Sequence, residues 1–456
     1  MRSYQFALVV LAGAVLIACG GGNNANPGPK IKFSSQVSFG DSLSDVGSYA
    51  VGTVAALKGG KFTINGDHAA IHPELSGKNW TEHMAAQFGL PAPCAAQTGL
   101  DGDAGQGFSV PVANHAGCYG YAMGGSRVTN PVGPNHKLTG SALGALTVPV
   151  VTQIANHLAA TGGKFKGDEI VFVMAGGNDV LLQLSALSAG AAAAGNAVGA
   201  QKFVTSLTMA LAAGATNPAA AAQAIGLALA AENARPGHTD STLVQVAVST
   251  AAIQPGNSAV ASPAVYGPLV AQAQADASAA GAAAGAAYAN DNGPTLVASM
   301  ATTGAELVAQ IKNQIVAKGA NHVVVNNLPD VAGTPAGLNK DAATKGLINA
   351  MVGAFNAQLS TGLAGESKVL LVDVFALSRD QSVNPGPYGL SNVMDTACDL
   401  SPAKNPLGSS LVCNSSNLKA GDVSHYAYAD DVHPTPYNNL LLARQVMKEM
   451  AAKGWL

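Results

Sequence analysis

Charged residues are scarce in this chain: they make up 11% of its 456 residues, against about a quarter in an average soluble protein. The formal net charge is −3, so no basic field favours binding to nucleic acid or to an anionic membrane surface. The five cysteines form no CxxC or cysteine–histidine pattern of the kind that binds zinc. These shortages argue against a nucleic-acid-binding protein and give no indication of a metal site. The length suits one large domain with insertions, or two or three smaller domains.

The N-terminal segment predicts export rather than a membrane span. An apolar stretch at 6–17 is too short to cross a bilayer. It ends in Leu16-Ile17-Ala18-Cys19, which resembles a bacterial lipobox, so we expect residues 1–18 to be a signal peptide and Cys19 to carry lipid. A plain secretory signal, and hence a secreted protein, is the alternative. Gly20, in place of aspartate, favours the outer membrane or cell surface by the same resemblance. We expect residues 19–34 to form the lipidated cysteine and a flexible tether.

Four cysteines remain for the mature chain, and export gives their number a meaning. An even number of cysteines in an oxidising compartment favours disulfides, and four cysteines allow three pairings. We prefer the two short-range pairs, Cys94 with Cys118 and Cys398 with Cys413, because each would close a loop rich in glycine, proline and polar residues. Spacing alone leaves the other pairings open.

A polar turn follows the first apolar run of the mature chain. Residues 37–39 predict a strand, and Gly40-Asp41-Ser42 interrupts it with residues that turns and helix N-caps prefer. A serine at a strand-to-helix turn has an exposed hydroxyl with helix N–H groups beside it. This arrangement suits a nucleophile, because those donors can meet the negative charge that forms in acyl transfer. On this stretch alone, the alternative is that Ser42 merely caps a helix.

Strands and helices alternate along much of the chain. Apolar runs at 169–175, 322–328 and 369–375 predict buried parallel strands, and helical patterns at 305–318 and 347–363 precede the last two of them. Strands that alternate with helices over this length favour a parallel sheet covered on both faces. We therefore predict an α/β fold with three layers, built around a doubly wound parallel sheet.

An alanine-rich segment at about 183–301 interrupts this pattern within a domain that we expect to span 35–456. The segment has high helix propensity but few large side chains, and Asn217-Pro218 and Asn292-Gly293-Pro294 are expected to break it. We interpret it as a helical insertion, or a lid, packed on the α/β body. A low-complexity linker is the alternative for part of it.

Three more stretches carry residues suited to chemistry. Gly124-Gly125 follows a short strand-like run, where paired glycines can point a backbone N–H into a pocket. Asn178 comes directly after an apolar run and could donate to an oxyanion, although asparagine is also an ordinary turn residue. Asp430 precedes His433 by three residues, so its carboxylate can reach Nδ1 while Nε2 stays free to act as a base. An acidic loop with a surface histidine is the alternative there.

Taken together, these stretches resemble the GDSL or SGNH hydrolase family, in its bacterial lipase and esterase branch. The matching motifs occur in the family's order: Gly40-Asp41-Ser42-Leu43, Ala122-Met123-Gly124-Gly125, Gly176-Gly177-Asn178-Asp179 and Asp430-Asp431-Val432-His433-Pro434. The resemblance implies an SGNH-like fold and makes Ser42 the nucleophile, His433 the base and Asp430 the residue that orients it. Asp431 has the wrong spacing to His433 for the motif. The oxyanion donors implied are the backbone N–H groups of Ser42 and Gly125 and the side chain of Asn178; Gly124 is hard to separate from Gly125 by sequence.

The activity that the resemblance implies is hydrolysis of carboxylic esters through an acyl-enzyme on Ser42, with no metal or organic cofactor. The implied partners are a small-molecule or lipid ester and, through Cys19, a membrane; nucleic acid is not among them. Carbohydrate O-acetyl esters and thioesters are alternative substrates for the same site. From another class, the alternative is a non-catalytic surface lipoprotein that binds a ligand through the alanine-rich insertion.

Overall fold

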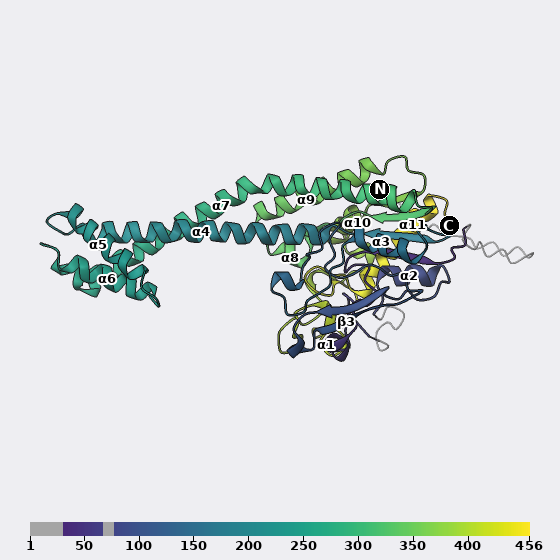
Figure 1. Ribbon diagram of the computed structural model, residues 1–456, viewed down its shortest axis with the longest axis horizontal. Coiled ribbons are helices and arrows are strands. Elements are labelled where there is room, and N and C mark those ends of the chain that lie inside the picture. Colours follow the sequence, from purple (N-terminus) through teal and green to yellow (C-terminus); the bar gives the residue numbers. More distant parts are fainter. Residues whose placement is uncertain (1–30, 67–76) are drawn as a thin grey trace, which may run out of the picture.

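The computed structural model describes residues 31–66 and 77–456. The expected signal peptide, Cys19 and most of the expected tether lie outside the described residues. The described chain consists of an α/β body with a long helical arm that projects from it (Figure 1).

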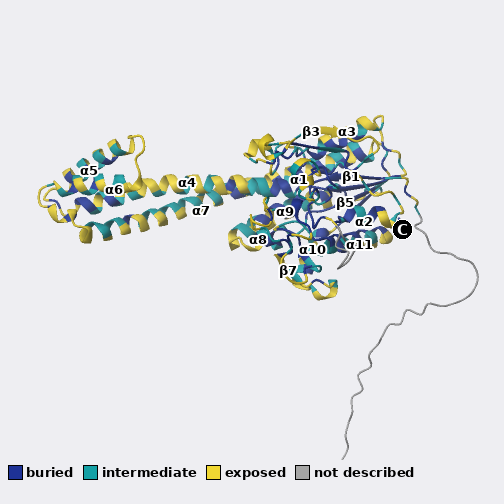
Figure 2. Cartoon of the chain, turned by 90° about the horizontal axis from the view of Figure 1, so that it is seen from below, coloured by how far each residue is buried: buried dark blue, intermediate teal, exposed yellow. Residues whose placement is uncertain are grey.

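A parallel sheet of four strands forms the centre of the body. In spatial order its strands are β1 (Gln36–Gly40), β4 (Ile170–Met174), β5 (His322–Asn326) and β6 (Val369–Val372). Every neighbouring pair is parallel, and the strands are buried (Figure 2). The predicted α/β class with a parallel sheet is thus confirmed.

Helices cover both faces of this sheet, as the alternation of side chains along each strand requires. On one face, alternate strand residues such as Val37 and Val171 pack with α3 (Val150–Ala160), α9 (Ala342–Gly362) and the inner end of α7 (Pro263–Gln310). On the other face, Phe172 and its neighbours pack with α2 (Trp80–Gln87), α10 (Val374–Val383) and α11 (Pro436–Ala452). Sheet and helices therefore form three layers.

The predicted third apolar run, 369–375, is only partly a strand. β6 ends at Val372 because the Asp373 side chain accepts a hydrogen bond from the Ala376 N–H and caps α10. Shorter elements surround the body: α1 (Gly52–Ala56), β2 (Gln97–Asp101), β3 (Ser109–Asn114), α8 (Pro335–Leu338), β7 (Asn392–Thr396), β8 (Tyr426–Tyr428), and the single turns η2 (Ala104–Gln106), η3 (Lys137–Thr139), η6 (Val331–Gly333), η7 (Gly386–Tyr388) and η8 (Ser410–Val412). A further single turn, η4 (Ser258–Ala261), lies in the arm.

The alanine-rich segment forms the arm. Helices α4 (Gly177–Ala212) and α7 (Pro263–Gln310) run side by side away from the body, and α5 (Pro218–Asn233) and α6 (Asp240–Ala252) lie at the far end (Figure 1). The tip has its own apolar core, which includes Leu211, Ile225 and Leu229. The expectation that the insertion packs on the body is wrong for this outer part: only the inner ends of α4 and α7 contribute to the core of the body.

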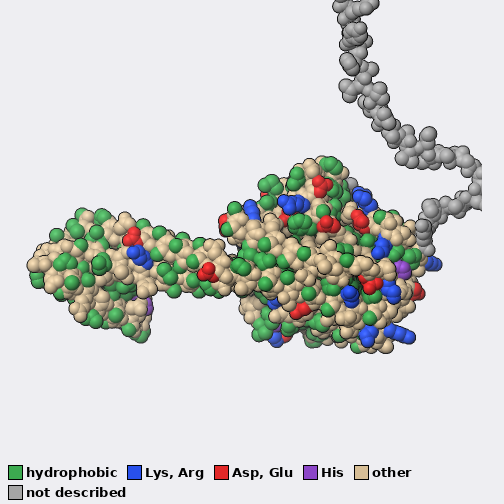
Figure 3. All heavy atoms as spheres, turned by 90° about the horizontal axis from the view of Figure 1, so that it is seen from above, with side chains coloured by type: hydrophobic (Ala, Val, Ile, Leu, Met, Phe, Trp, Pro, Cys, Tyr) green, Lys and Arg blue, Asp and Glu red, His purple; other side chains and the backbone are tan. Residues whose placement is uncertain are grey.

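The arm carries few charges. Between residues 183 and 301 the sequence has six charged residues, Lys202, Glu232, Arg235, Asp240, Asp276 and Asp291, and the arm surface is mostly apolar or uncharged (Figure 3). Among the described helices, α4 alone is long and apolar enough to cross a membrane by length and composition. The first turn of α4 nevertheless lies in the body, where Val180 belongs to the core.

The predicted break at Asn292-Gly293-Pro294 is also wrong, because α7 continues through it and through Pro268. Nearby side chains supply hydrogen bonds at this point: the Asn292 amide donates to the Tyr288 carbonyl, and the Thr295 hydroxyl donates to the Asn292 carbonyl. α7 then passes into a π-helical stretch, η5 (Ile311–Val316), that leads to β5.

Candidate active site

Ser42 lies in a tight turn directly after β1, at the carboxyl end of the parallel sheet. Gly40 precedes the turn with φ of 148°, and a Cβ atom there would lie 2.0 Å from the carbonyl oxygen of Met174 on β4. Only glycine allows β1 to approach β4 this closely. The Ser42 side chain is nearly buried, 8% exposed, and lines a cavity of about 210 Å³.

The turn is not the start of a helix, contrary to the expected strand-to-helix turn. The next helix, α1, begins only at Gly52. The Asp45 carboxylate explains the difference, because it accepts hydrogen bonds from the N–H groups of Gly47 and Ser48 at 2.8 Å each and holds the segment in turns. Ser42 therefore caps no helix, and the helix N-terminus at its cavity is that of α4 (Gly177–Ala212), whose Gly177 and Asn178 line the cavity with it.

His433 is hydrogen-bonded to Ser42. It lies in the loop between β8 and α11, and its Nε2 is 2.8 Å from Ser42 Oγ. Its Nδ1 is 2.8 Å from both carboxylate oxygens of Asp430. The structure thus brings together the serine, histidine and aspartate that the sequence motifs single out, although the serine is 391 residues from the histidine.

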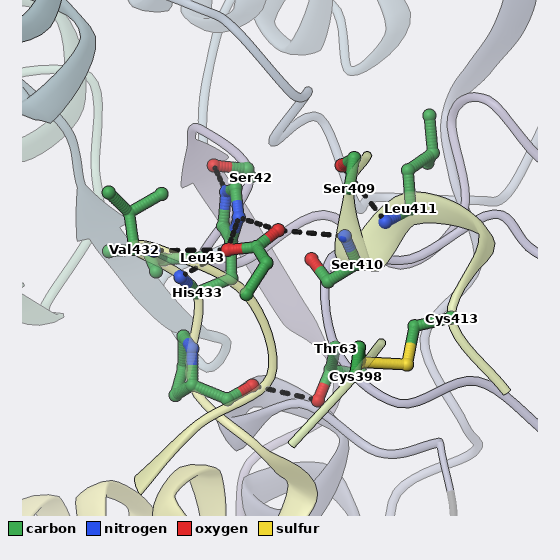
Figure 4. A network of polar contacts seen from close by, with 12 residues as sticks. Ser42, Leu43, Thr63, Cys398, Ser409, Ser410, Leu411, Cys413, Val432 and His433 are labelled. Carbon is green, nitrogen blue, oxygen red and sulfur yellow. Dashed lines mark hydrogen bonds and ion pairs between the residues drawn. A yellow bond between two sulfur atoms is a disulfide. The ribbon is translucent and has the colours of Figure 1, made fainter. Parts of the chain in front are cut away.

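The surrounding backbone fixes the Asp430 carboxylate. Its Oδ1 accepts from the N–H groups of Val432 and His433, and its Oδ2 accepts from the Ser410 N–H at 2.7 Å. Ser410 begins η8, next to the Cys398–Cys413 disulfide (Figure 4). Sequence reasoning missed Ser410, because only the folded chain brings it to Asp430.

The charges of this pair support each other. Burial alone would lower the pKa of His433, but the charge of Asp430 and its hydrogen bond outweigh burial and raise that pKa above its ordinary value. Burial would likewise raise the pKa of Asp430, but the charge of His433 and the hydrogen bonds from His433 and Ser410 hold it well below its usual range. A raised histidine pKa makes Nε2 a stronger proton acceptor for a hydroxyl beside it.

A second buried carboxyl lies in the same cavity. Burial raises the pKa of Asp41 to about 7, and the charge of His433 opposes that rise. Its Oδ1 accepts a hydrogen bond from the Leu43 N–H at 3.1 Å, which helps to hold the turn around Ser42.

Asn178 and Gly125 lie on the same cavity as Ser42. Asn178 is in the first turn of α4, and its Nδ2 donates to the Ser126 carbonyl at 2.9 Å. An amide nitrogen carries two hydrogens, so the second can serve a bound molecule. The Gly124 N–H, by contrast, donates to Asp45 Oδ2 at 2.8 Å. The geometry therefore favours Gly125 over Gly124 as a donor to this cavity.

Contacts from both sides hold the glycine loop. The Tyr49 hydroxyl donates to the Gly124 carbonyl at 2.7 Å. Arg127 Nε donates to Asp179 Oδ1 at 2.8 Å, and the Val128 N–H donates to the other oxygen of that carboxylate. These bonds join the loop to the first turn of α4, so the Gly125 and Asn178 donors form one connected unit.

Apolar side chains form much of the remaining cavity wall. Phe62 packs on the His433 ring with 4.9 Å between ring centroids. The other apolar lining residues include Leu181, Leu328, Pro329, Val331 and Val432. Sequence reasoning missed Phe62 because it belongs to none of the motifs. An acyl or other apolar group bound beside Ser42 would find a compatible surface here.

The described cysteines form the two short-range disulfides, Cys94–Cys118 and Cys398–Cys413. The preferred pairing is confirmed, and two disulfides indicate a chain that folds in an oxidising, extracytoplasmic compartment. Neither disulfide lines the cavity beside Ser42.

Fold and geometry thus define an α/β protein with a hydrogen-bonded serine–histidine–aspartate set at the carboxyl end of its sheet. No protein-family model matches this chain, and no curated protein matches it in sequence.

Proposed function

We propose that the protein is a serine ester hydrolase of the GDSL or SGNH type, with Ser42, His433 and Asp430 as its catalytic residues. One observation carries the proposal: two consecutive 2.8 Å contacts join Ser42 Oγ to His433 Nε2 and His433 Nδ1 to Asp430. The order of the four motifs along the chain, with its resemblance to that family, supports it independently. An SGNH-like fold forms part of the same proposal.

The chemistry follows from the positions of these atoms. Ser42 Oγ attacks the ester carbonyl carbon while His433 Nε2 accepts the hydroxyl proton. The N–H groups of Ser42 and Gly125 and the Asn178 amide stabilise the oxyanion that forms. His433 then protonates the departing alcohol and leaves the acyl group on Ser42. Water attacks this acyl-enzyme by the same sequence of proton transfers and releases the acid.

The test compares the full chain, purified in detergent, with its Ser42→Ala variant on p-nitrophenyl esters. We expect hydrolysis by the wild-type chain and its loss, by about 10³-fold or more, in the variant. Equal activity in the two proteins would contradict the proposal. If neither hydrolyses an ester, acetylated sugars and thioesters are tested next. Inactivity on all three from folded protein favours a non-catalytic binding protein.

We propose further that the protein is an exported lipoprotein anchored through Cys19 in the outer membrane or at the cell surface. The disulfides support export, and the lipobox resemblance supports the anchor. Radioactive palmitate supplied to cells that make the protein should label the wild-type chain but not Cys19→Ser. Equal labelling of both would contradict the anchor.

A further inference from the structure

The cavity beside Ser42 adjoins a larger one at the base of the arm. Leu181, Val331 and Thr334 line both cavities, and the second has a volume of about 540 Å³. A third cavity, of about 570 Å³, adjoins the second through Leu184 and Ser188. We call these three adjoining cavities the groove; they lie in a row that starts at the candidate nucleophile and continues between α4, α8 and the two helices α7 and α9.

One face of α4 forms a wall along the whole groove. Its lining residues Leu181, Leu184, Ser188 and Ala191 are spaced by three or four residues, so they lie above one another on the same side of the helix. Ten residues of α-helix span about 15 Å. The inserted helix that supplies Asn178 at its first turn therefore continues outward as the wall of this groove.

The lining of the groove suits an apolar occupant. Leucine, valine, isoleucine, alanine and proline side chains line its second and third cavities together with serine and threonine hydroxyls, the Asn290 amide and two glycines. Lys340 and Asp341 are the charged residues among the lining residues that the structure describes, and both are exposed. A hydrocarbon chain needs only contact and exclusion of water, and the leucine and isoleucine side chains along α4 and α9 supply that contact.

We propose that this groove binds the acyl chain of the substrate and that the enzyme is selective for long-chain fatty acyl esters. This inference rests on the proposed ester hydrolase function. The ester carbonyl would lie at Ser42, and the chain would pass Leu181 and follow α4 toward Ser188. The alcohol leaves in the first half-reaction, whereas the acyl group becomes bonded to Ser42 and remains there until water releases the acid in the second. A groove that begins at this serine therefore assists both half-reactions if it binds the acyl chain.

The experiment measures kcat/KM of the full chain in detergent for p-nitrophenyl butyrate, octanoate and palmitate. Ser185→Trp and Ser188→Trp place a large ring in the groove. Ala186→Trp places the same ring on an exposed face of α4 that lines none of the three cavities. We expect wild type to prefer palmitate to butyrate by about tenfold or more, because each fully buried methylene is worth up to about fourfold.

Both groove variants should lower the palmitate-to-butyrate ratio at least tenfold, while Ala186→Trp leaves the ratio at the wild-type value. A wild-type preference for butyrate, or an unchanged ratio in both groove variants, would overturn the acyl assignment while leaving the ester hydrolase proposal intact. A wild-type chain that cleaves no ester overturns both proposals.

Two esters of equal length separate the acyl side from the alcohol side. Methyl palmitate carries its long chain on the acyl side, and hexadecyl acetate carries it on the alcohol side. We expect faster hydrolysis of methyl palmitate, and loss of that advantage in Ser188→Trp. Faster hydrolysis of hexadecyl acetate would assign the groove to the alcohol and contradict the inference.

Discussion

At the scale of single residues, Asp430 is the group on which His433 depends most. Asp430→Asn removes the charge that raises the pKa of His433 and disturbs the tautomer that keeps Nε2 free. We expect kcat to fall by about 10³- to 10⁴-fold. His433 must be neutral to accept a proton, so the wild-type rate declines as pH falls through its raised pKa. In the variant this decline moves to lower pH, and a pH profile of kcat/KM measures the shift. An unmoved acid limb would contradict the role of Asp430.

Asn178 supplies the proposed side-chain donor to the oxyanion. Asn178→Ala should cost about 3 kcal/mol of transition-state stabilisation, seen as a 10²- to 10³-fold fall in kcat. KM should change little, because the oxyanion exists only after attack. Gln183→Ala, a change further along α4, serves as the control. A rise in KM at unchanged kcat would mean that Asn178 binds the substrate and does not stabilise the oxyanion.

Asp45 is a positioning residue: it holds backbone segments of the site and does not line the cavity itself. Its carboxylate accepts hydrogen bonds from the Gly47 N–H and from the Gly124 N–H. The first bond shapes the turn after Ser42, and the second holds the glycine loop. The sequence does not indicate this role, because the partner of Asp45, Gly124, lies 79 residues away. Local sequence patterns do not indicate contacts between residues so far apart along the chain. The contact of Ser410 with Asp430 was missed for the same reason.

At the scale of elements, the two disulfides have different consequences. Cys398–Cys413 holds the segment whose Ser410 N–H donates to Asp430, whereas Cys94–Cys118 closes the loop before the segment that pairs with β1 and holds no described residue that bonds Asp430. Replacing either pair by alanine should lower the free energy of unfolding by about 3 kcal/mol. Well below both melting temperatures, only the Cys398→Ala/Cys413→Ala double variant should lose kcat. Equal kcat in the two double variants would contradict the link to Asp430.

The α4–α7 hairpin depends on glycine at its contact. A Cβ atom on Gly281 would lie 2.8 Å from the Gly195 carbonyl oxygen, so a larger side chain must separate the helices. Gly281→Leu should lower the free energy of unfolding of the arm by about 1–3 kcal/mol. Gly226 in α5 has no atom of the described structure within 4 Å of such a Cβ, so Gly226→Leu is the matched control and should gain stability. Amide hydrogen exchange along the arm measures the stability of both variants. Equal protection of the arm amides in Gly281→Leu and Gly226→Leu would contradict this packing.

At the scale of the whole molecule, a buried histidine makes the body sensitive to acid. Burial lowers the pKa of His157 to about 4; its side chain lies among Phe39, Tyr121 and Phe165. Below about pH 6.5 this histidine takes up a proton in the unfolded chain but not in the folded chain. The free energy of unfolding therefore falls as the pH drops from about 6.5 toward 4. His157→Phe removes this titrating group and its contribution to the pH dependence. Its melting temperature should therefore fall less than that of wild type between about pH 7 and pH 5, and an equal fall would contradict the account.

The sequence predicted the parts of the molecule that local patterns encode. The strands β4 and β5 contain apolar runs, at 170–174 and 323–325, and an even number of cysteines in an exported chain favoured disulfides, with the short-range pairs preferred among three pairings. The arm could be expected as helix from its alanine content, but not as a projecting hairpin, because small side chains provide no apolar stripe to indicate which face packs. The path of α7 through Pro294 is accompanied by side-chain hydrogen bonds of Asn292 and Thr295, which composition does not show.

The most direct test of the central claim is covalent labelling of the nucleophile. A fluorophosphonate reacts with an activated serine, and peptide mass spectrometry locates the adduct. We predict one adduct, on Ser42, in the full chain, and none in Ser42→Ala. In His433→Ala labelling should be slower by about 10³-fold or more, because the hydroxyl loses its base. An adduct on another residue, or equal labelling of wild type and His433→Ala, would contradict a serine activated by His433.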